Sequence, residues 1–299
     1  MTVLDPLGHH TRDALNPSTQ YRRVPRLFAA PPLRWHLHRI KPDIIHVHQG
    51  KAARVANKAK GDIPVVATLH GTYAAKSFAR CDGIVRVADH QIAEMAGYRG
   101  PSTTISNWLV SSNIEPLSKA AARAQLGLPD DEFIFGFVGR LASVKGINDL
   151  LSAFGAIKSP DCALSIIGDG SARGLVDKAS KADRRIHFHG HRADAQQLMA
   201  AFDCLVLPSH AEAFGLVLLE AFAAGCPVIA TETKGALEVL DGSGARTVPI
   251  GDAQKLTDAM REERQAPSNL DFGKTLKRYK RRTQIERALD FYAHLTARA

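Results

Sequence analysis

Hydrophobic and polar positions in the second half of the chain alternate between short apolar runs and longer segments with helical spacing. Five runs rich in β-branched and aromatic residues predict buried strands at 133–138, 163–167, 185–189, 204–207 and 228–231. Between the last two, the pattern predicts a helix over 215–224 that ends at Gly225, and another helix is expected from about Gly146. Strands and helices that alternate in this way predict a parallel sheet wrapped by helices.

The first half shows the same alternation in a weaker form. Short strands are predicted at 44–48, 65–69, 83–87 and 103–105. The stretch 127–131 combines turn formers with acidic residues and therefore marks the expected domain boundary. Near the end, apolar residues recur at helical spacing and predict a closing amphipathic helix. We therefore expect an N-terminal domain at 1–130, a C-terminal domain at 131–280 and a closing helix at 281–299, the last carrying Ile285, Leu289, Tyr292 and Leu295 on its apolar face.

Composition is that of a globular protein. Of the 299 residues, 45% are hydrophobic and 23% are charged, which is enough apolar material for two α/β domains. No run approaches the roughly 20 apolar residues that a membrane-spanning helix needs, and the N-terminus lacks a secretory signal pattern. The cysteines are widely spaced, so we expect reduced thiols in a cytoplasmic protein; they are Cys81, Cys162, Cys204 and Cys226.

The net charge of +9 is concentrated in the N-terminal half. Residues 1–130 hold 17 Lys and Arg against 9 Asp and Glu, whereas residues 131–299 hold 22 against 21. This excess indicates either an anionic partner, such as phospholipid headgroups or a phosphorylated acceptor, or merely a soluble basic surface. Nucleic acid is not an expected partner, because aromatic content is only 6% and basic and aromatic residues do not interleave.

The end of the strand at 133–138 carries the first candidate constellation. Gly139 and Arg140 follow that strand, and Lys145 and Gly146 come a few residues later. A glycine at a strand end lets the backbone approach a ligand, and a helix start with two nearby cations suits a diphosphate. The alternative interpretation is an ordinary strand-to-helix turn with two exposed cations.

Two carboxylates form the second constellation. Glu212 lies in the loop before the helix at 215–224, and Glu220 projects from that helix about two turns on. Their neighbours are nearly all apolar, so both carboxylates need partners, and the vicinal hydroxyls of a ribose and a hexose are suitable ones. A solvated helix face is the less favoured alternative.

Histidines raise a third possibility. His70 ends a predicted strand, where a lone histidine is more often structural than catalytic. Metal sites are conceivable at two clusters of alternate histidines, but no supporting Cys or carboxylate spacing accompanies them, so no metal is expected; the clusters are His46/His48 and His187/His189/His191. The sequence also lacks Asp-x-Asp, a P-loop and a dinucleotide-binding glycine loop. A metal-independent transferase would need cations and helix N-termini to stabilise its leaving group.

Together these segments resemble glycosyltransferase family 4, whose members are retaining enzymes of the GT-B fold. The matching segments lie in family order between residues 42 and 240, and the block with Glu-x7-Glu is the most specific; they are 42–48, 68–71, 138–141 with 145–146, 167–170, 207–209 and 212–230. The resemblance implies two Rossmann-like domains facing across a cleft, with the closing helix returning to the N-terminal domain. It also implies that a nucleotide-diphosphate sugar is the substrate and that no cofactor is needed.

Residue roles follow from the resemblance. Arg140 and Lys145, next to Gly139, would bind the donor diphosphate, and Glu220 would hold the ribose hydroxyls. Glu212 would face the transferred sugar, and His70 would reach that sugar from the N-terminal domain. The backbone N–H groups near the sugar and phosphate would be those of Phe214, Gly215 and Leu216.

The N-terminal half departs from the family pattern. Residues 1–6 are similar to the family's second strand, so the first strand, the glycine-rich loop and the first helix are expected to be absent and the domain shortened. The basic half also resembles transferases of bacterial envelope polysaccharide or lipopolysaccharide core. The expected function is therefore a metal-independent, retaining hexosyltransferase with a glycan or lipid-linked acceptor, at the cytoplasmic face of the membrane. The alternative is an inactive donor-binding remnant of such an enzyme.

Overall fold

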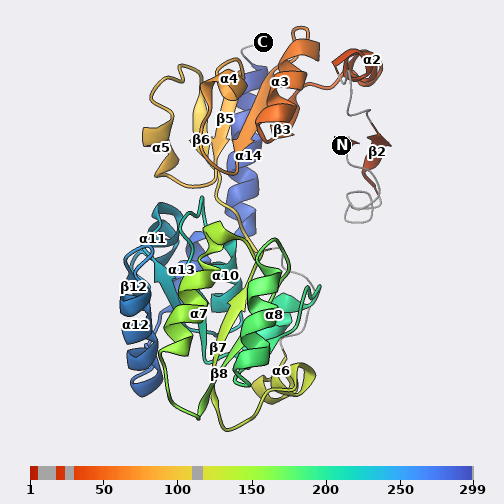
Figure 1. Cartoon of the computed structure of the whole chain (residues 1–299). Helices are drawn as coiled ribbons and strands as arrows, with labels where there is room; N and C mark the ends of the chain where they lie inside the picture. Colours follow the sequence, from red (N-terminus) through yellow and green to blue (C-terminus); the bar gives the residue numbers. More distant parts are fainter. Residues whose placement is uncertain (6–17, 24–29, 110–116, 298–299) are drawn as a thin grey trace. The chain divides into compact units, whose positions relative to one another are not determined.

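The computed structural model describes residues 1–5, 18–23, 30–109 and 117–297 and divides the chain into two compact units (Figure 1). Unit 1 comprises Met1–Ile105 with Glu286–Ala299, and unit 2 comprises Ser106–Ile285. Each unit contains a parallel sheet with helices, so the α/β class expected from the sequence is confirmed. The division falls at Ile105–Ser106, whereas the turn-rich stretch used as the expected boundary lies within unit 2.

Unit 1 is built on a four-stranded parallel sheet. Its strands run in sequence order, and all four lie within one residue of the predicted bounds at each end; they are β3 (Ile45–His48), β4 (Val65–Leu69), β5 (Gly83–Arg86) and β6 (Ser102–Thr104). Helices α3 (Gly50–Ala59), α4 (Ala75–Phe78) and α5 (Gln91–Glu94) connect the strands. A separate parallel pair and a further helix precede them: β1 (Thr2–Asp5), β2 (Gln20–Arg23) and α2 (Ala30–Ile40).

The two faces of this sheet differ in chemistry. Every residue of β4 is buried, as a strand covered on both faces requires. Val65, Ala67 and Leu69 pack with Ala53 and Ala56 of α3 in an apolar core. Alternation along a strand places the residues between them on the opposite face. That opposite face carries His46 and His48 of β3 and Thr68 of β4.

Helix α14 (Arg281–Thr296) also contacts the sheet of unit 1. A Cβ atom on Gly83, at the start of β5, would lie 2.6 Å from Leu295 Cδ1 and 3.0 Å from the Phe291 ring, so both side chains would have to shift to admit a larger residue there. Phe291 and Leu295 are buried, whereas Leu289 is 59% exposed. The expected helix is therefore present, but the placement of Leu289 on its buried face was wrong because Phe291 takes that role.

Unit 2 contains a six-stranded parallel sheet. The five predicted strands are confirmed, and a sixth that the sequence did not reveal joins at the edge; the order is β12 (Arg246–Val248), β11 (Val228–Thr231), β10 (Cys204–Leu207), β7 (Phe133–Val138), β8 (Cys162–Ile167) and β9 (Ile186–Phe188). The strand β12 was missed because its three residues include the charged Arg246 and form no apolar run. The main helices are α6 (Lys119–Leu126), α7 (Ile147–Gly155), α8 (Arg173–Ala182), α10 (Leu216–Ala223), α11 (Lys234–Leu240), α12 (Ala253–Gln265) and α13 (Phe272–Arg278).

The strand order of unit 2 reverses at its centre. From β7 the chain passes to β8 on one side, whereas β10 pairs with β7 on the other side. Connections that diverge from neighbouring parallel strands leave a crevice at the carboxyl ends of those strands. Residues that follow β7 and β10 are therefore the first place to look for a ligand site.

All four cysteines are buried and free. Within the described part of the chain, no helix is both long enough and apolar enough to cross a membrane.

Candidate functional site

Close glycine contacts bring the loops at the strand-order reversal together. Gly146 has φ +66°, and a Cβ atom there would lie 1.9 Å from the carbonyl oxygen of Pro208, the residue after β10. A Cβ atom on Gly168, after β8, would lie 1.9 Å from the carbonyl oxygen of Gly139, after β7. Only glycine permits backbones to approach this closely. The loops after β7, β8 and β10 therefore form one packed rim at the carboxyl end of the sheet.

An ion pair links two of these loops. Lys145 Nζ lies 2.5 Å from Glu212 Oε1, and the two side chains are 23% and 10% exposed. The sequence assigned the cation to a diphosphate and the carboxylate to a sugar, without relating them to each other. The structure brings Lys145 and Glu212 together as an ion pair. If either side chain moves away, the ammonium group and the carboxylate both become available to a ligand.

Ser209 supports Glu212 from the buried side, and the sequence did not single out its side chain. Its Oγ–H donates to Glu212 Oε1 over 2.7 Å, and Ser209 is fully buried. Its carbonyl oxygen accepts from Thr231 Oγ1, at the end of β11, over 2.5 Å. The carboxylate of Glu212 is thus fixed by the loop after β10 and, through it, by the neighbouring strand.

The segment from Glu212 to Leu216 leads into α10. Phe214 is buried, and its ring packs edge-on against Tyr279 at a centroid distance of 5.2 Å. Gly215 has φ +87° and precedes α10 without any side-chain cap. Gly235 of α11 lies so close behind the loop that a Cβ atom would be 2.6 Å from Phe214 N. The first turn of α10 thus keeps backbone N–H groups that no side chain caps, and this favours an anion.

Glu220 lies inside α10, half-buried between the buried residues Leu219 and Ala221. Burial raises the pKa of its carboxyl group. The side chain has no hydrogen bond or ion pair to any residue that the structure describes. A half-buried carboxylate without a protein partner is well suited to accept hydrogen bonds from ligand hydroxyls.

Gly139 and Arg140 stand at the end of β7. Gly139 N donates to the carbonyl oxygen of Ile167, which holds the loop against β8. The Arg140 side chain is exposed and forms no hydrogen bond or ion pair within the described residues. It is therefore a cation that a bound anion can recruit without breaking a protein contact.

His70 belongs to unit 1, where it follows β4 directly. Its Nε2 lies 2.9 Å from Nδ1 of His48, the last residue of β3. His46 lies deeper in the sheet: one ring nitrogen contacts the Tyr292 hydroxyl of α14, and the other lies 2.6 Å from Thr68 Oγ1. Residues that the sequence treated as a lone histidine and a separate histidine pair thus form one cluster.

The histidines of this cluster are disfavoured as cations. Burial, followed by the charges of the two other histidines, lowers the pKa of His46 to about 4. Burial lowers the pKa of His48, with a further contribution from His70, and burial also lowers the pKa of His70. His48 and His70 are nevertheless partly exposed to solvent. Their lowered pKa values therefore favour neutral rings that donate and accept hydrogen bonds near pH 7.

The backbone around His70 is held by Gln91, a residue that the sequence analysis missed. Gln91 is 1% exposed, and its Nε2 donates to the carbonyl oxygens of Leu69 (3.3 Å) and Gly71 (2.9 Å). Its Oε1 accepts from the N–H groups of Val87 and Ala88. The amide side chain therefore ties the turn after β4 to the turn after β5. No local sequence signal marks a glutamine for such a role.

The second histidine cluster is not a comparable centre. His189 Nε2 lies 3.0 Å from Ser165 Oγ, and burial, with the charges of His187 and Arg192, lowers the pKa of His189 to about 4. Among the described residues, no group of three or more His, Cys, Asp or Glu side chains is arranged to hold a metal ion.

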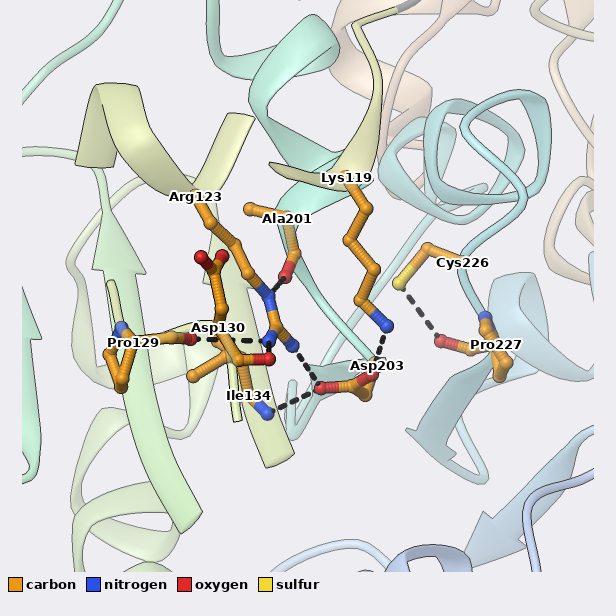
Figure 2. A network of polar contacts seen from close by, with 9 residues as sticks. All are labelled: Lys119, Arg123, Pro129, Asp130, Ile134, Ala201, Asp203, Cys226 and Pro227. Carbon is orange, nitrogen blue, oxygen red and sulfur yellow. Dashed lines mark hydrogen bonds and ion pairs between the residues drawn. The ribbon is translucent and has the colours of Figure 1, made fainter. Parts of the chain in front are cut away.

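A hollow of about 650 Å³ lies at the opposite, amino-terminal edge of the unit 2 sheet, and its buried cation, Arg123, is already paired. Arg123 of α6 is 3% exposed and contacts Asp203 over 2.7 Å (Figure 2). The same carboxylate accepts from Ile134 N over 2.7 Å and contacts Lys119. The Arg123 guanidinium also donates to the carbonyl oxygens of Pro129, Asp130 and Ala201. This network fixes α6 against the sheet and is structural.

Comparison with known families identifies the chain. Residues 5–108 match the family model described as "Glycosyltransferase Family 4", and residues 132–263 match the model described as "Glycosyl transferases group 1". The chain combines a glycosyltransferase family 4 domain with a glycosyl transferases group 1 domain. The family resemblance drawn from the motifs is therefore confirmed, and the two matched regions account for most of the chain.

Relatives with curated names are glycosyltransferases of several kinds. The putative teichuronic acid biosynthesis glycosyltransferase TuaC of Bacillus subtilis is 30% identical over 73% of this chain and 60% of its own length. The lipopolysaccharide core biosynthesis glycosyltransferase LpsE of Rhizobium meliloti is 28% identical over 75% of this chain and 66% of its own length. The chain thus spans about 60% of the length of the curated relatives it matches.

Solved structures agree on the GT-B fold. A glycosyltransferase from Rickettsia africae superimposes with a TM-score of 0.82 at 17% identity, covering 98% of this chain and 89% of its own. Anabaena HepE, solved in complex with UDP and glucose, superimposes with a TM-score of 0.78 at 21% identity, covering 92% of this chain and 86% of its own. At these identities the likeness concerns the fold alone.

Proposed function

We propose that this glycosyltransferase binds a nucleotide-diphosphate sugar in unit 2 and transfers the sugar, a hexose, with retention of anomeric configuration. The observation that carries the proposal is the Lys145–Glu212 ion pair at the strand-order reversal, next to the uncapped start of α10. Positive and negative groups placed side by side suit a ligand that has both phosphates and hydroxyls.

Donor binding would exchange the partners of this ion pair. Lys145 turns to the diphosphate, where Arg140 adds a second cation and the first turn of α10, at Phe214, Gly215 and Leu216, adds N–H groups. Glu212, still held by Ser209, accepts a hydrogen bond from a hydroxyl of the sugar. The Gly139 turn lets the backbone approach the phosphates. Cations and a helix N-terminus then stabilise the leaving group without a metal ion.

Glu220 supplies the ribose contact in this proposal. Its half-buried carboxylate accepts hydrogen bonds from the two vicinal ribose hydroxyls, which compensates the burial that raises its pKa. Because UDP is bound by the structurally similar HepE, UDP-sugars are the first donors to test.

In the proposed reaction the bond between the sugar C1 and the phosphate oxygen breaks while the acceptor oxygen attaches to C1 on the same face. The acceptor hydroxyl gives its proton to an oxygen of the departing diphosphate. His70 is proposed to bind the transferred sugar from unit 1. The residues of unit 2 keep the leaving diphosphate in place while it takes up charge and proton.

The proposed acceptor is a glycan or a lipid-linked glycan of the bacterial envelope. The names of TuaC and LpsE support this class. Cations also gather in the basic N-terminal half: Arg34 of α2 and Lys51 and Lys58 of α3 are exposed, and the Arg39 guanidinium lies 4.8 Å from the ring centroid of the exposed Trp35. A cationic surface with an aromatic residue favours peripheral contact with an anionic membrane. We therefore propose a cytoplasmic protein that works at the membrane face.

Calorimetry combined with turnover tests the donor site. The chain and its Glu220→Ala variant are titrated with UDP, GDP, ADP and their glucose conjugates, and sugar release is followed in parallel. We expect one diphosphate to bind, the variant to lose that binding, and slow release of sugar by the wild type. Binding without turnover would instead favour an inactive donor-binding protein. Folded protein that binds no diphosphate would remove the basis for the proposal.

A further inference from the structure

His48 and His70 meet where two neighbouring parallel strands end. In the register of β3 and β4, His48 is opposite Thr68, and His70 follows two residues later on the same face. The two rings have centroids 5.1 Å apart, with Nδ1 of His48 2.9 Å from Nε2 of His70. This is a normal hydrogen-bond distance, so one of the two nitrogens carries the shared proton.

His46 packs against the His48 ring of this pair. Its ring stacks on His48 at a centroid distance of 4.9 Å and an angle of 20°. Both of its own nitrogens are engaged, by Tyr292 and Thr68, so the ring cannot turn without losing two contacts. His48 therefore packs on a fixed surface and presents its Nδ1 toward His70.

The backbone of His70 is held by a different residue. Gln91 binds the carbonyl oxygens on both sides of His70 and is itself fully hydrogen-bonded. The main-chain position of His70 thus does not depend on His48. What His48 contributes is the orientation of the imidazole ring and the location of its proton.

We propose that His48 is a positioning residue for His70: their hydrogen bond occupies Nε2 of His70, fixes the ring and selects its tautomer. The remaining nitrogen, Nδ1, is then the one that meets the ligand. The functional consequence rests on the proposed function, in which His70 binds the transferred sugar. The claim that His48 fixes the ring and tautomer of His70 does not rest on the proposed function, because it concerns only the ligand-free protein.

Histidine nuclear magnetic resonance tests the positional claim directly. Protein labelled with ¹⁵N in its histidine rings is examined at pH 7.5, and the His70 signals are assigned from their loss in His70→Gln. We expect His70 of the wild type to show one neutral tautomer. A solvent-averaged mixture of tautomers in the wild type would overturn the proposal without any variant.

Three variants complete the test. His48→Leu removes the hydrogen bond, and His48→Asn keeps a polar atom near the position of Nδ1. His38→Leu removes an exposed histidine of α2 and is the matched control. We expect His48→Leu to shift His70 to a mixture of tautomers, His48→Asn to preserve one tautomer, and His38→Leu to leave the signals unchanged. Unchanged His70 signals in folded His48→Leu would overturn the proposal.

Turnover measures the functional part. With a UDP-sugar that the wild type hydrolyses, His48→Leu should lower kcat about tenfold and leave KM within about twofold, since misorientation affects the reacting geometry more than donor binding. His48→Asn should recover most of this loss, and equal kcat values for the wild type and His48→Leu would overturn the functional claim. If the wild type hydrolyses no donor, the proposed function fails while the resonance experiment still decides the positional claim.

Discussion

Lys145 and Glu212 lie 67 positions apart in the sequence, yet their charged atoms meet at 2.5 Å on the rim of the unit 2 sheet. Lys145 comes from the loop after β7 and Glu212 from the loop after β10. Lys145 and Ser209 both contact Oε1 of Glu212, which leaves Oε2 without a partner among the described residues. Oε2 of Glu212 can therefore accept a hydrogen bond from a ligand without any rearrangement. The Lys145 ammonium group can reach a ligand after a small movement of its side chain.

Loss of the Lys145 cation should weaken donor binding. A charge-assisted hydrogen bond contributes roughly 1.5–3 kcal/mol, so Lys145→Met should raise the Kd for UDP about tenfold to a hundredfold. Calorimetry measures the change, and Lys178→Met, which removes an exposed lysine of α8, is the control. Equal UDP affinity for Lys145→Met and the control would show that Lys145 does not touch the diphosphate.

Glu220 should make stability depend on pH in a defined direction. Burial raises its pKa above the ordinary value of 4.5, so the unfolded chain gives up this proton at lower pH than the folded chain does. Below pH 4.5 the carboxyl group is protonated in both the folded and the unfolded chain, so it does not change the free energy of unfolding. As pH rises from 4.5 through the folded-state pKa, ionisation of Glu220 lowers the free energy of unfolding. We expect Glu220→Gln to raise Tm relative to wild type at about pH 8 but not at about pH 4. A Tm difference that is the same at both pH values would contradict this prediction.

The Arg123–Asp203 pair should be essential to the fold but not to the site. Arg123→Met leaves the carboxylate of Asp203 without its buried cation and should lower the free energy of unfolding by about 3 kcal/mol. Lys119 contacts the same carboxylate but its side chain is 51% exposed, so Lys119→Met should cost less than about 1 kcal/mol. Urea unfolding compares the two. Equal effects of both substitutions would show that burial does not set the strength of this network.

Gly146 should tolerate no side chain. A Cβ atom there meets the Pro208 carbonyl oxygen, in addition to the strain of φ +66°. Gly225 has a similar φ of +71°, but a Cβ atom there would have no neighbour within 4 Å, so Gly225→Ala should cost only the strain, about 1–2 kcal/mol. Gly146→Ala should lower the free energy of unfolding clearly further and weaken UDP binding by displacing Lys145. Urea unfolding and calorimetry check both effects, and two equally stable variants would refute the steric argument.

Membrane contact should depend on charge on α3. Co-sedimentation with vesicles of phosphatidylcholine and phosphatidylglycerol should retain the wild type at low salt and release it at high salt. The double variant Lys51→Glu and Lys58→Glu should bind far less. Lys178→Glu with Lys181→Glu on α8 changes the net charge equally and should bind like wild type. Similar loss in both double variants would indicate a nonspecific charge effect.

Local pattern sufficed for much of the fold. Buried parallel strands such as 133–138 and 65–69 are continuous apolar runs bounded by turn residues, and their ends were predicted to within a residue. The strand β12 was not predicted, because its residues include the charged Arg246 and form no apolar run. The buried side of α14 was predicted only in part, because Phe291 packs beside Gly83 while Leu289 is exposed.

The sequence by itself determined the α/β class, the family and the residue types at the rim, because these depend on short-range periodicity and on motifs that are contiguous in the chain. Tertiary structure alone decided that Lys145 meets Glu212, that Ser209 supports it, and that His48 and Gln91 hold the ring and backbone of His70. The physical reason is that side chains interact through space. Strand order and register bring distant residues within hydrogen-bond range, and neither can be inferred from the spacing of residues along one chain.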